Sequence, residues 1–229
     1  MFVASLDLGK LADFTALAIL ECEGTPHEAG IPRQRYSQLA GGYGTVIEKQ
    51  TYMGSPACFD VVHLERWPLG TTYPAIVEGV GELVRQVSGH CSLVVDSGGV
   101  GEPVVDLFRQ AGLGPVAFYI TAGGEARADM DPWRLYVPKG ELVSTIAVGL
   151  QTKRLRIAPE LALAEVLAQE LRDFEVAVTP AANLTYNART GAHDDLVLAV
   201  AMGCWFAEMV YASPVTFTVH NDPYTIGRY

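Results

Sequence analysis

Cysteine is scarce in this sequence and is not arranged for zinc binding. Four cysteines occur among 229 residues, at Cys22, Cys58, Cys91 and Cys204. No two of them form a C-x-x-C pair, and no histidine stands at the spacing of a zinc ligand. The pattern argues against a structural zinc site and is typical of a reduced intracellular chain.

Long apolar runs are also missing. The most apolar stretch, residues 196–207, has 12 residues before Glu208, whereas a helix that spans a bilayer needs about 20. The N-terminal residues reach Asp7 before an apolar signal core can form. We therefore expect a soluble protein with no secretory peptide and no membrane partner.

Basic residues are outnumbered by acidic ones. The chain has 16 Lys and Arg against 26 Asp and Glu, which gives a formal net charge of −10. Proteins that bind nucleic acid without sequence preference usually show a basic excess, so this balance at first disfavours a polyanionic partner.

The charge is unevenly distributed along the chain. Residues 127–156 carry six basic residues against three acids, a local charge of +3 that leaves −13 on the remainder. If they flank a crevice, these residues would hold phosphates in a weak and salt-dependent way; scattered surface charges are the alternative. The candidates for DNA binding are Lys139, Arg127, Arg134, Lys153, Arg154 and Arg156, with Arg189 further along the chain.

The apolar content is sufficient for one globular domain. With 49% hydrophobic and 18% charged residues, a chain of this length can bury about 70% of its unfolded surface and is neither disordered nor fibrous. We expect the domain to cover residues 1–211, with a long Gly- and Pro-containing insertion at 23–57 that includes a hairpin around 43–52. Residues 212–229 are expected to form a loosely attached tail.

The order of strand-like and helix-like segments predicts an α/β fold. Apolar alternation or short apolar runs favour strands at 2–7, 14–20, 59–66, 93–96 and 116–121, with a brief segment at 155–157. Apolar residues at helical spacing favour helices at 74–87, 102–110, 138–150, 159–174 and 193–211. We predict a central mixed sheet of five or more strands, the first three antiparallel, with helices on its faces.

Three separate apolar segments each carry Asp at one end. Asp7 ends the first strand, Asp96 ends the fourth, and Asp194 with Asp195 opens the last helix. Each acid alone has an ordinary explanation as a turn residue or a helix cap. Two adjacent acids in front of a very apolar helix place more negative charge against the core than a cap needs, which favours neutralisation by a cation.

An oxygen-only ligand set favours Mg²⁺ or Mn²⁺ over zinc or copper. Carboxylates that hold two such ions about 3.5–4 Å apart are the apparatus of phosphodiester hydrolysis. The sequence therefore predicts metal-dependent phosphoryl transfer to water, with Asp7, Asp96, Asp194 and Asp195 as catalytic metal ligands.

The ordered motifs resemble the nuclease domain of tailed-phage terminase large subunits. They are VASLDLG at 3–9 with DFTA at 13–16, VVDSGGVG at 94–101, YVPK at 136–139 and HDDL at 193–196. The resemblance covers nearly the whole chain and implies a ribonuclease H-like fold. It also implies an endonuclease that cuts double-stranded concatemeric viral DNA during genome packaging in the host cell cytoplasm, with two Mg²⁺ or Mn²⁺ ions.

Carried over by position, the resemblance makes Asp7 the shared metal ligand, Asp96 the second ligand, and Asp194 or Asp195 the ligand from the helix. It implies that His193 lies beside the metals and that Asp13 acts behind the ligands. An ATPase motor domain, the small terminase subunit and the portal of the procapsid are the implied partners. The chain lacks the G-x-x-x-x-G-K-[ST] loop of the motor, so we expect no DNA translocation by this chain alone.

Three alternatives remain open from the sequence. A Holliday-junction resolvase of the same fold would use the same chemistry on another substrate. A docking module for the portal would have lost catalysis. An actin-like or sugar-kinase-like ATPase lobe shares the opening strands and D-x-G-G turns, but that fold needs two lobes.

Overall fold

An eight-stranded mixed sheet forms the centre of the computed structural model, which describes residues 1–9, 13–24, 33–37, 42–46, 58–99, 102–130, 133–178, 184–188 and 193–211. Its strands are β1 (Phe2–Asp7), β2 (Thr15–Glu23), β5 (Cys58–Trp67), β6 (Cys91–Asp96), β7 (Val116–Thr121), β8 (Arg127–Met130), β9 (Trp133–Pro138) and β10 (Leu155–Ile157). The helices are α1 (Tyr73–Gln86), α2 (Glu102–Gln110), α3 (Lys139–Gln151), α4 (Ala164–Asp173) and α5 (Asp195–Tyr211). Two separate hairpins pair β3 (Arg33–Ser37) with β4 (Gly42–Val46), and β11 (Phe174–Val178) with β12 (Leu184–Ala188).

The strand order across the sheet is β10-β5-β2-β1-β6-β7-β9-β8. Strands β1, β2 and β5 form an antiparallel meander, whereas β6, β7 and β9 continue parallel to β1. The carboxyl ends of β1, β6, β7 and β9 therefore lie along the same end of the sheet, where open α/β sheets bind their ligands. The far end is marked by β10, which pairs with the first residues of β5.

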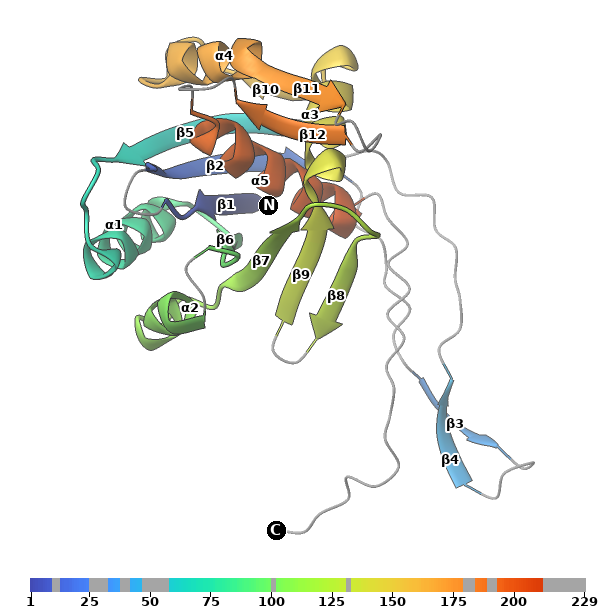
Figure 1. Cartoon of the computed structure of the whole chain (residues 1–229). Helices are drawn as coiled ribbons and strands as arrows, with labels where there is room; N and C mark the ends of the chain where they lie inside the picture. The colour runs from blue at the N-terminus through green and yellow to red at the C-terminus, as the bar shows by residue number, and fades with distance from the viewer. Residues whose placement is uncertain are drawn as a thin grey trace.

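Helices cover both faces of the sheet (Figure 1). On one face α1 and α2 pack on apolar residues such as Ala4, Leu6 and Val95. On the other face α5 crosses β1 and β2, with α3 and α4 beside it. Because residues alternate between faces of a strand, Val3, Ser5 and Asp7 all lie on the α5 face.

Helix α5 packs unusually close to the sheet. A Cβ atom added at Gly203 would come within 2.6 Å of Leu20 Cδ1 and 2.7 Å of Ser5 Oγ. The buried Ser5 hydroxyl donates a hydrogen bond to the Ala199 carbonyl at 2.7 Å. Small residues at the contact thus hold the helix against β1, which places its N-terminus near the end of that strand.

The predicted fold class is confirmed, with differences in detail. The sheet has eight strands, of which β8 and β9 were not expected from the sequence. The separate β11–β12 hairpin was not expected either. Helix α4 begins at Ala164, since residues 159–163 form turns instead of the expected first helical turn. The hairpin in the insertion lies at 33–46, earlier than expected. The predicted tail, 212–229, lies outside the described residues, and no helix of the described part is long and apolar enough to cross a membrane.

Candidate functional site

The sheet brings Asp7 and Asp96 together. Strands β1 and β6 are parallel neighbours in register up to the pair Leu6 and Val95, and each ends with its Asp at the next position. Because residues alternate between the two faces of a strand, both acids lie on the face of the sheet that α5 covers. Asp7 is 8% exposed, so its carboxylate lies under the other elements of the site.

The turn after Asp7 is tight. The Gly9 N–H donates to Thr15 Oγ1 at 3.1 Å, and a Cβ atom at Gly9 would come within 2.2 Å of the Asp13 carbonyl oxygen. Glycine is required there because the chain returns directly against itself. The same turn brings Asp13 near the site: burial raises the pKa of Asp195, and the charge of Asp13 adds a small effect in the same direction.

Asp96 also has the turn role that its sequence context suggests. Its Oδ1 accepts a hydrogen bond from the Gly98 N–H at 2.9 Å, and the buried Ser97 hydroxyl donates to the Val95 carbonyl at 3.2 Å. These bonds fix the loop that leaves β6. They hold the Asp96 carboxylate at the end of the strand, beside Asp7.

The two acids of α5 are each matched with a cation from another element. Asp194 accepts the first helical bond at its carbonyl, from the Leu198 N–H at 2.8 Å, and its Oδ2 lies 2.9 Å from Lys139 Nζ at the start of α3. Asp195 is 5% exposed, and its Oδ2 lies 3.4 Å from Arg66 Nη2 at the end of β5. Both carboxylates are therefore held in place by side chains distant in the sequence.

His193, which the family resemblance placed beside the metal ligands, lies next to Asp195. Its Nδ1 is 3.8 Å from Asp195 Oδ2. Its ring packs edge-on against Phe14, with 5.0 Å between ring centres. The contact with Phe14 orients an imidazole that is 42% exposed.

Carboxylate charge accumulates around Asp7. Burial raises the pKa of Asp7 well above its usual range, and the carboxylates of Asp96, Asp195 and Asp194 raise it further, against an opposing effect of Lys139. Four acids from three segments thus lie close enough to affect one another. A divalent cation among them would relieve this repulsion.

Two residues of the site were missed in the sequence. Glu170 of α4 is 5% exposed, and its Oε2 accepts hydrogen bonds from the N–H groups of Leu196 and Val197 at 3.0 and 3.2 Å. Its other oxygen pairs with Arg66. Burial raises the pKa of Glu170, while Arg66 opposes that effect.

The sequence contains a signal for Glu170 but none for Arg66. Glu170 follows Ala164 and Leu167 at three-residue spacing, so an acid occupies a position of the apolar helix face. Arg66 could not be assigned from the sequence because β5 contains a bulge, at which the pairing with β2 skips Val62. The residues of β5 that face α5 are odd-numbered before the bulge and even-numbered after it. Simple alternation from Phe59 places Arg66 on the wrong face.

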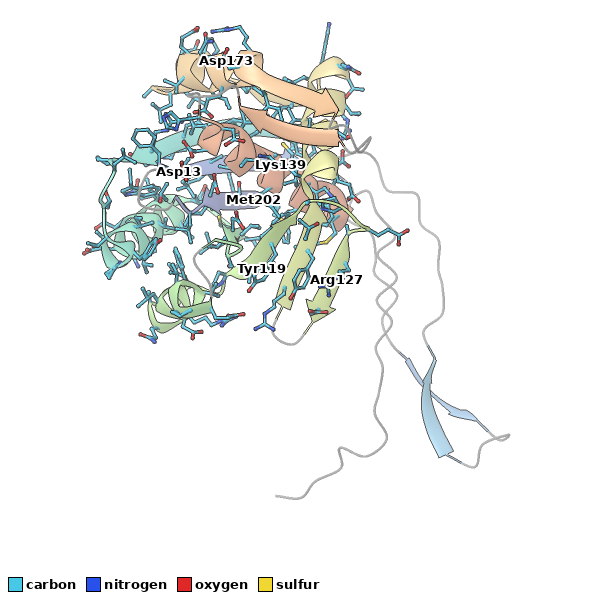
Figure 2. The ribbon with its side chains drawn as sticks, viewed as in Figure 1. Asp13, Tyr119, Arg127, Lys139, Asp173 and Met202 are labelled. Atoms are coloured by element: carbon cyan, nitrogen blue, oxygen red, sulfur yellow. The ribbon has the colours of Figure 1, made fainter. Side chains whose placement is uncertain are left out.

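Of the basic residues expected to bind phosphates, Lys139 lies at the site. Arg134 instead pairs with Glu102 of α2, and the Arg127 guanidinium packs 3.7 Å from the ring centre of Tyr136. Both belong to the opposite face of the sheet. Figure 2 shows Arg127 and Tyr119 grouped on the β7–β9–β8 side, apart from Asp13.

The other basic candidates lie at the far end of the sheet. Arg154 pairs with Glu208 near the end of α5, and Arg156 pairs with Asp60 on β5. Lys153 is exposed in the turn before β10, with a positive φ of 58°. Arg189 lies outside the described residues. The six described basic residues therefore do not form one patch around the acidic site.

A cleft of about 520 Å³ lies away from the acids as well. It is formed by β8, α3 and the last turns of α5, with Leu135, Trp205 and Met209 among its lining residues. Its apolar lining contains no member of the acidic site.

The acidic side chains do not form a closed metal cage. Within the described ranges, no three His, Cys, Asp or Glu residues are grouped tightly enough to hold a metal ion. The α5 carboxylates are paired with Lys139 and Arg66. The donor set is nevertheless an all-oxygen one from three elements, which is the chemistry that Mg²⁺ and Mn²⁺ prefer.

No family model matches the chain, and no curated protein matches its sequence. Among solved structures, the magnesium-bound large terminase nuclease of thermophilic phage G20c superposes with a TM-score of 0.58 at 18% identity, covering 90% of this chain and 80% of that one. The large terminase nuclease domain of Thermus phage P74-26 gives 0.51 at 18% identity, with 89% and 77% covered. The manganese-soaked terminase nuclease domain of human cytomegalovirus gives 0.50 at 13% identity, with 98% and 85% covered.

These superpositions extend over most of both chains and confirm the predicted architecture. They record a likeness of fold, since fewer than one residue in five is identical. The chain has the ribonuclease H-like fold of terminase nuclease domains, with an eight-stranded mixed sheet flanked by helices.

Proposed function

We propose that the chain is a divalent-metal-dependent endonuclease that cuts double-stranded concatemeric viral DNA during genome packaging. The single observation that carries this proposal is the gathering of Asp7, Asp96, Asp194 and Asp195 from three separate segments at one end of the sheet. Independent caps and turns have no reason to converge. The fold shared with terminase nuclease domains supports the same conclusion.

The metal ligands in this proposal are Asp7 and Asp96, with Asp194 or Asp195 from α5. Two bound Mg²⁺ or Mn²⁺ ions would activate water and stabilise the leaving oxygen of a phosphodiester. The protein holds Asp7 rigidly because β1 is the centre of the sheet and α5 lies directly on it. Asp96 is fixed by the turn that its own side chain caps.

Two further residues serve the substrate. Lys139 lies 2.9 Å from Asp194 and places a positive charge at the edge of the acidic site, where a DNA phosphate would approach. The exposed side of His193 is available to donate a hydrogen bond to the scissile phosphate or to a carboxylate. The far-end residues Arg154 and Arg156 are too distant in the fold for this role.

Weak intrinsic DNA binding follows from this arrangement. The chain has a net charge of −10, and the described basic residues of the 127–156 segment are divided between two faces and two ends of the sheet. We propose that a separate ATPase motor domain, acting with the small terminase subunit and the portal, holds the DNA against the site. The nuclease alone would then cut with little sequence preference.

The test is cleavage of supercoiled plasmid by the purified chain with Mn²⁺, Mg²⁺ or EDTA. Wild type should produce open-circular and linear DNA with either metal and none with EDTA. Asp7→Asn and Asp96→Asn should be inactive. Equal activity in wild type and both variants would contradict the proposal, and ATP hydrolysis by the chain would favour the kinase-like alternative.

A further inference from the structure

An ion pair between Glu170 and Arg66 lies next to the acidic N-terminus of α5. Glu170 is 5% exposed and is contributed by α4, a helix that carries none of the proposed ligands. One of its oxygens accepts two free N–H groups of the first turn of α5, from Leu196 and Val197. The first N–H groups of a helix have no partner within it, so Glu170 fixes the position of this turn.

The other oxygen of Glu170 pairs with Arg66. Arg66 Nη2 lies 3.4 Å from Asp195 Oδ2, so one guanidinium joins a carboxylate of α4 to a carboxylate of α5. The Arg66 guanidinium also packs over the Phe14 ring, at 4.9 Å from its centre. These contacts leave the Arg66 head group little freedom to turn away from Asp195.

The register of the sheet places Arg66 in line with the site. Asp7 of β1 is opposite Ala16 of β2, and Ala16 is opposite Arg66 of β5. All three follow the α5 face, so Arg66 and Asp7 are two strands apart, or about 10 Å. The intervening residue has only a methyl group, which leaves space above it for Asp195.

Capping of α5 alone does not require this arrangement. A Ser, Thr or Asp at the start of the helix satisfies free N–H groups from a local position. Here a carboxylate from a different helix is buried at the cost of removing its charge from water, and a partly buried Arg compensates for that charge. The free-energy cost of burying this pair is accounted for if the site requires a fixed orientation of Asp195.

We propose that Glu170 and Arg66 are positioning residues for the metal site, in which Glu170 fixes both the first turn of α5 and Arg66, and Arg66 limits the movement of Asp195 so that its carboxylate stays near Asp7. This inference rests on the proposed function, because the orientation of Asp195 has a role only if the site binds metal. Neither residue touches the substrate. Their removal should weaken metal binding while the fold is retained.

Arg66→Gln separates positioning from simple charge. The substitution removes a positive charge near the acids, so an effect of charge alone would tighten Mn²⁺ binding. Positioning predicts the opposite, a dissociation constant for Mn²⁺ that rises by about 10–100-fold, the effect typical of removing a residue that orients a metal ligand. Calorimetric titration of the full chain with Mn²⁺ measures this constant without reference to activity.

Glu170→Gln and Glu208→Gln form a matched pair. Each replaces the acid of a partly buried Arg–Glu pair that anchors α5, one at its N-terminus and one near its C-terminus. Glu170→Gln should weaken Mn²⁺ binding and raise the Mn²⁺ concentration for half-maximal plasmid cleavage by a similar factor. Glu208→Gln should leave both unchanged. Arg66→Lys, which keeps the charge but loses the planar fork, should recover part of the affinity.

Unchanged or tighter Mn²⁺ binding in folded Arg66→Gln would overturn the positioning role. If Arg66→Gln does not fold, the test relies on Arg66→Lys and Glu170→Gln. Wild-type affinity for Mn²⁺ in both variants would overturn the positioning role, and weakened affinity in both would support it. Equal weakening by Glu208→Gln would also overturn it, because the effect would then be general. A wild-type chain that neither binds Mn²⁺ nor cleaves plasmid defeats the proposed function itself, which distinguishes the two failures.

Discussion

The two ends of the central sheet treat charge in opposite ways. At the far end, where β10 meets the start of β5, Arg154 pairs with Glu208 and Arg156 pairs with Asp60. At the carboxyl ends of β1 and β6, the cations Lys139 and Arg66 are shared by a larger group of described carboxylates. These are Asp7, Asp96, Glu170, Asp194 and Asp195.

The difference indicates what each end is for. Matched pairs contribute modestly to stability and require nothing else. An excess of carboxylates in a buried position is unfavourable for folding and persists where function needs it. Under the proposed function, a cation from solution would offset the excess of carboxylates at the acidic end, whereas the pairs at the far end already balance each other.

Asp7→Asn should have the largest effect on function. Asp7 is the buried acid on which Asp96, Asp194 and Asp195 all act. Its loss should lower the plasmid cleavage rate by roughly 10³-fold or more, as removal of a catalytic group commonly does. Cleavage assays over a range of Mn²⁺ concentrations measure this. Activity restored by excess Mn²⁺ would show that Asp7 contributes to affinity alone.

Asp195→Asn and Asp194→Asn should differ from one another. Asp195 is 5% exposed and has the stronger influence of the two on the pKa of Asp7, whereas Asp194 is more exposed and pairs with Lys139. We expect about a 100-fold loss of activity for Asp195→Asn and about a 10-fold loss for Asp194→Asn, within the range for ligands and their supports. Single-turnover cleavage by both variants tests the order; the reverse order would assign the ligand to Asp194.

Metal should stabilise the acidic end and thereby the whole domain. A free Mn²⁺ concentration about 100 times the dissociation constant adds about 2.7 kcal/mol of stability, which is about 5–10 °C in Tm for a domain of this size. Thermal unfolding in EDTA and in Mn²⁺ provides the comparison. Asp7→Asn should lose most of this shift and Glu208→Gln should keep it, so equal shifts in wild type and Asp7→Asn would contradict a site at Asp7.

Without metal, the two ends should respond to neutralisation with opposite signs. Asp7→Asn removes a buried charge surrounded by like charges and should stabilise the metal-free chain by about 2 kcal/mol, the order of one such repulsion at partly screened distance. Glu208→Gln breaks a matched pair and should destabilise it by about 1 kcal/mol. Urea unfolding in EDTA measures both. Destabilisation by both substitutions would remove the contrast between the ends.

The sequence predicted the parts of the site that are continuous in the chain. Asp7 and Asp96 became candidates because each ends an apolar strand, and the structure pairs these two strands side by side. Asp194 and Asp195 became candidates because two acids precede a very apolar helix, whereas His193 was added by the family resemblance. These features are local in the sequence, and the α/β topology brings the corresponding side chains close together in space.

What the sequence did not reveal depends on tertiary geometry. The bulge at Val62 places Arg66 on the inner face, and no local pattern of apolar residues announces such a bulge. Glu170 was read as part of an amphipathic helix, although its burial follows from the docking of α4 on α5. The basic residues between Arg127 and Arg156 are grouped in the sequence but not in the structure. The segment from β8 to β10 places them on different faces and at different ends of the sheet.

The most direct test of the central claim is a crystal structure of the chain soaked in Mn²⁺, with anomalous scattering used to locate the metal. The account predicts anomalous density between Asp7, Asp96 and the N-terminus of α5, with Asp195 as a ligand held by Arg66. Absence of density there in well-ordered crystals, or density confined to other carboxylates of the surface, would contradict the account.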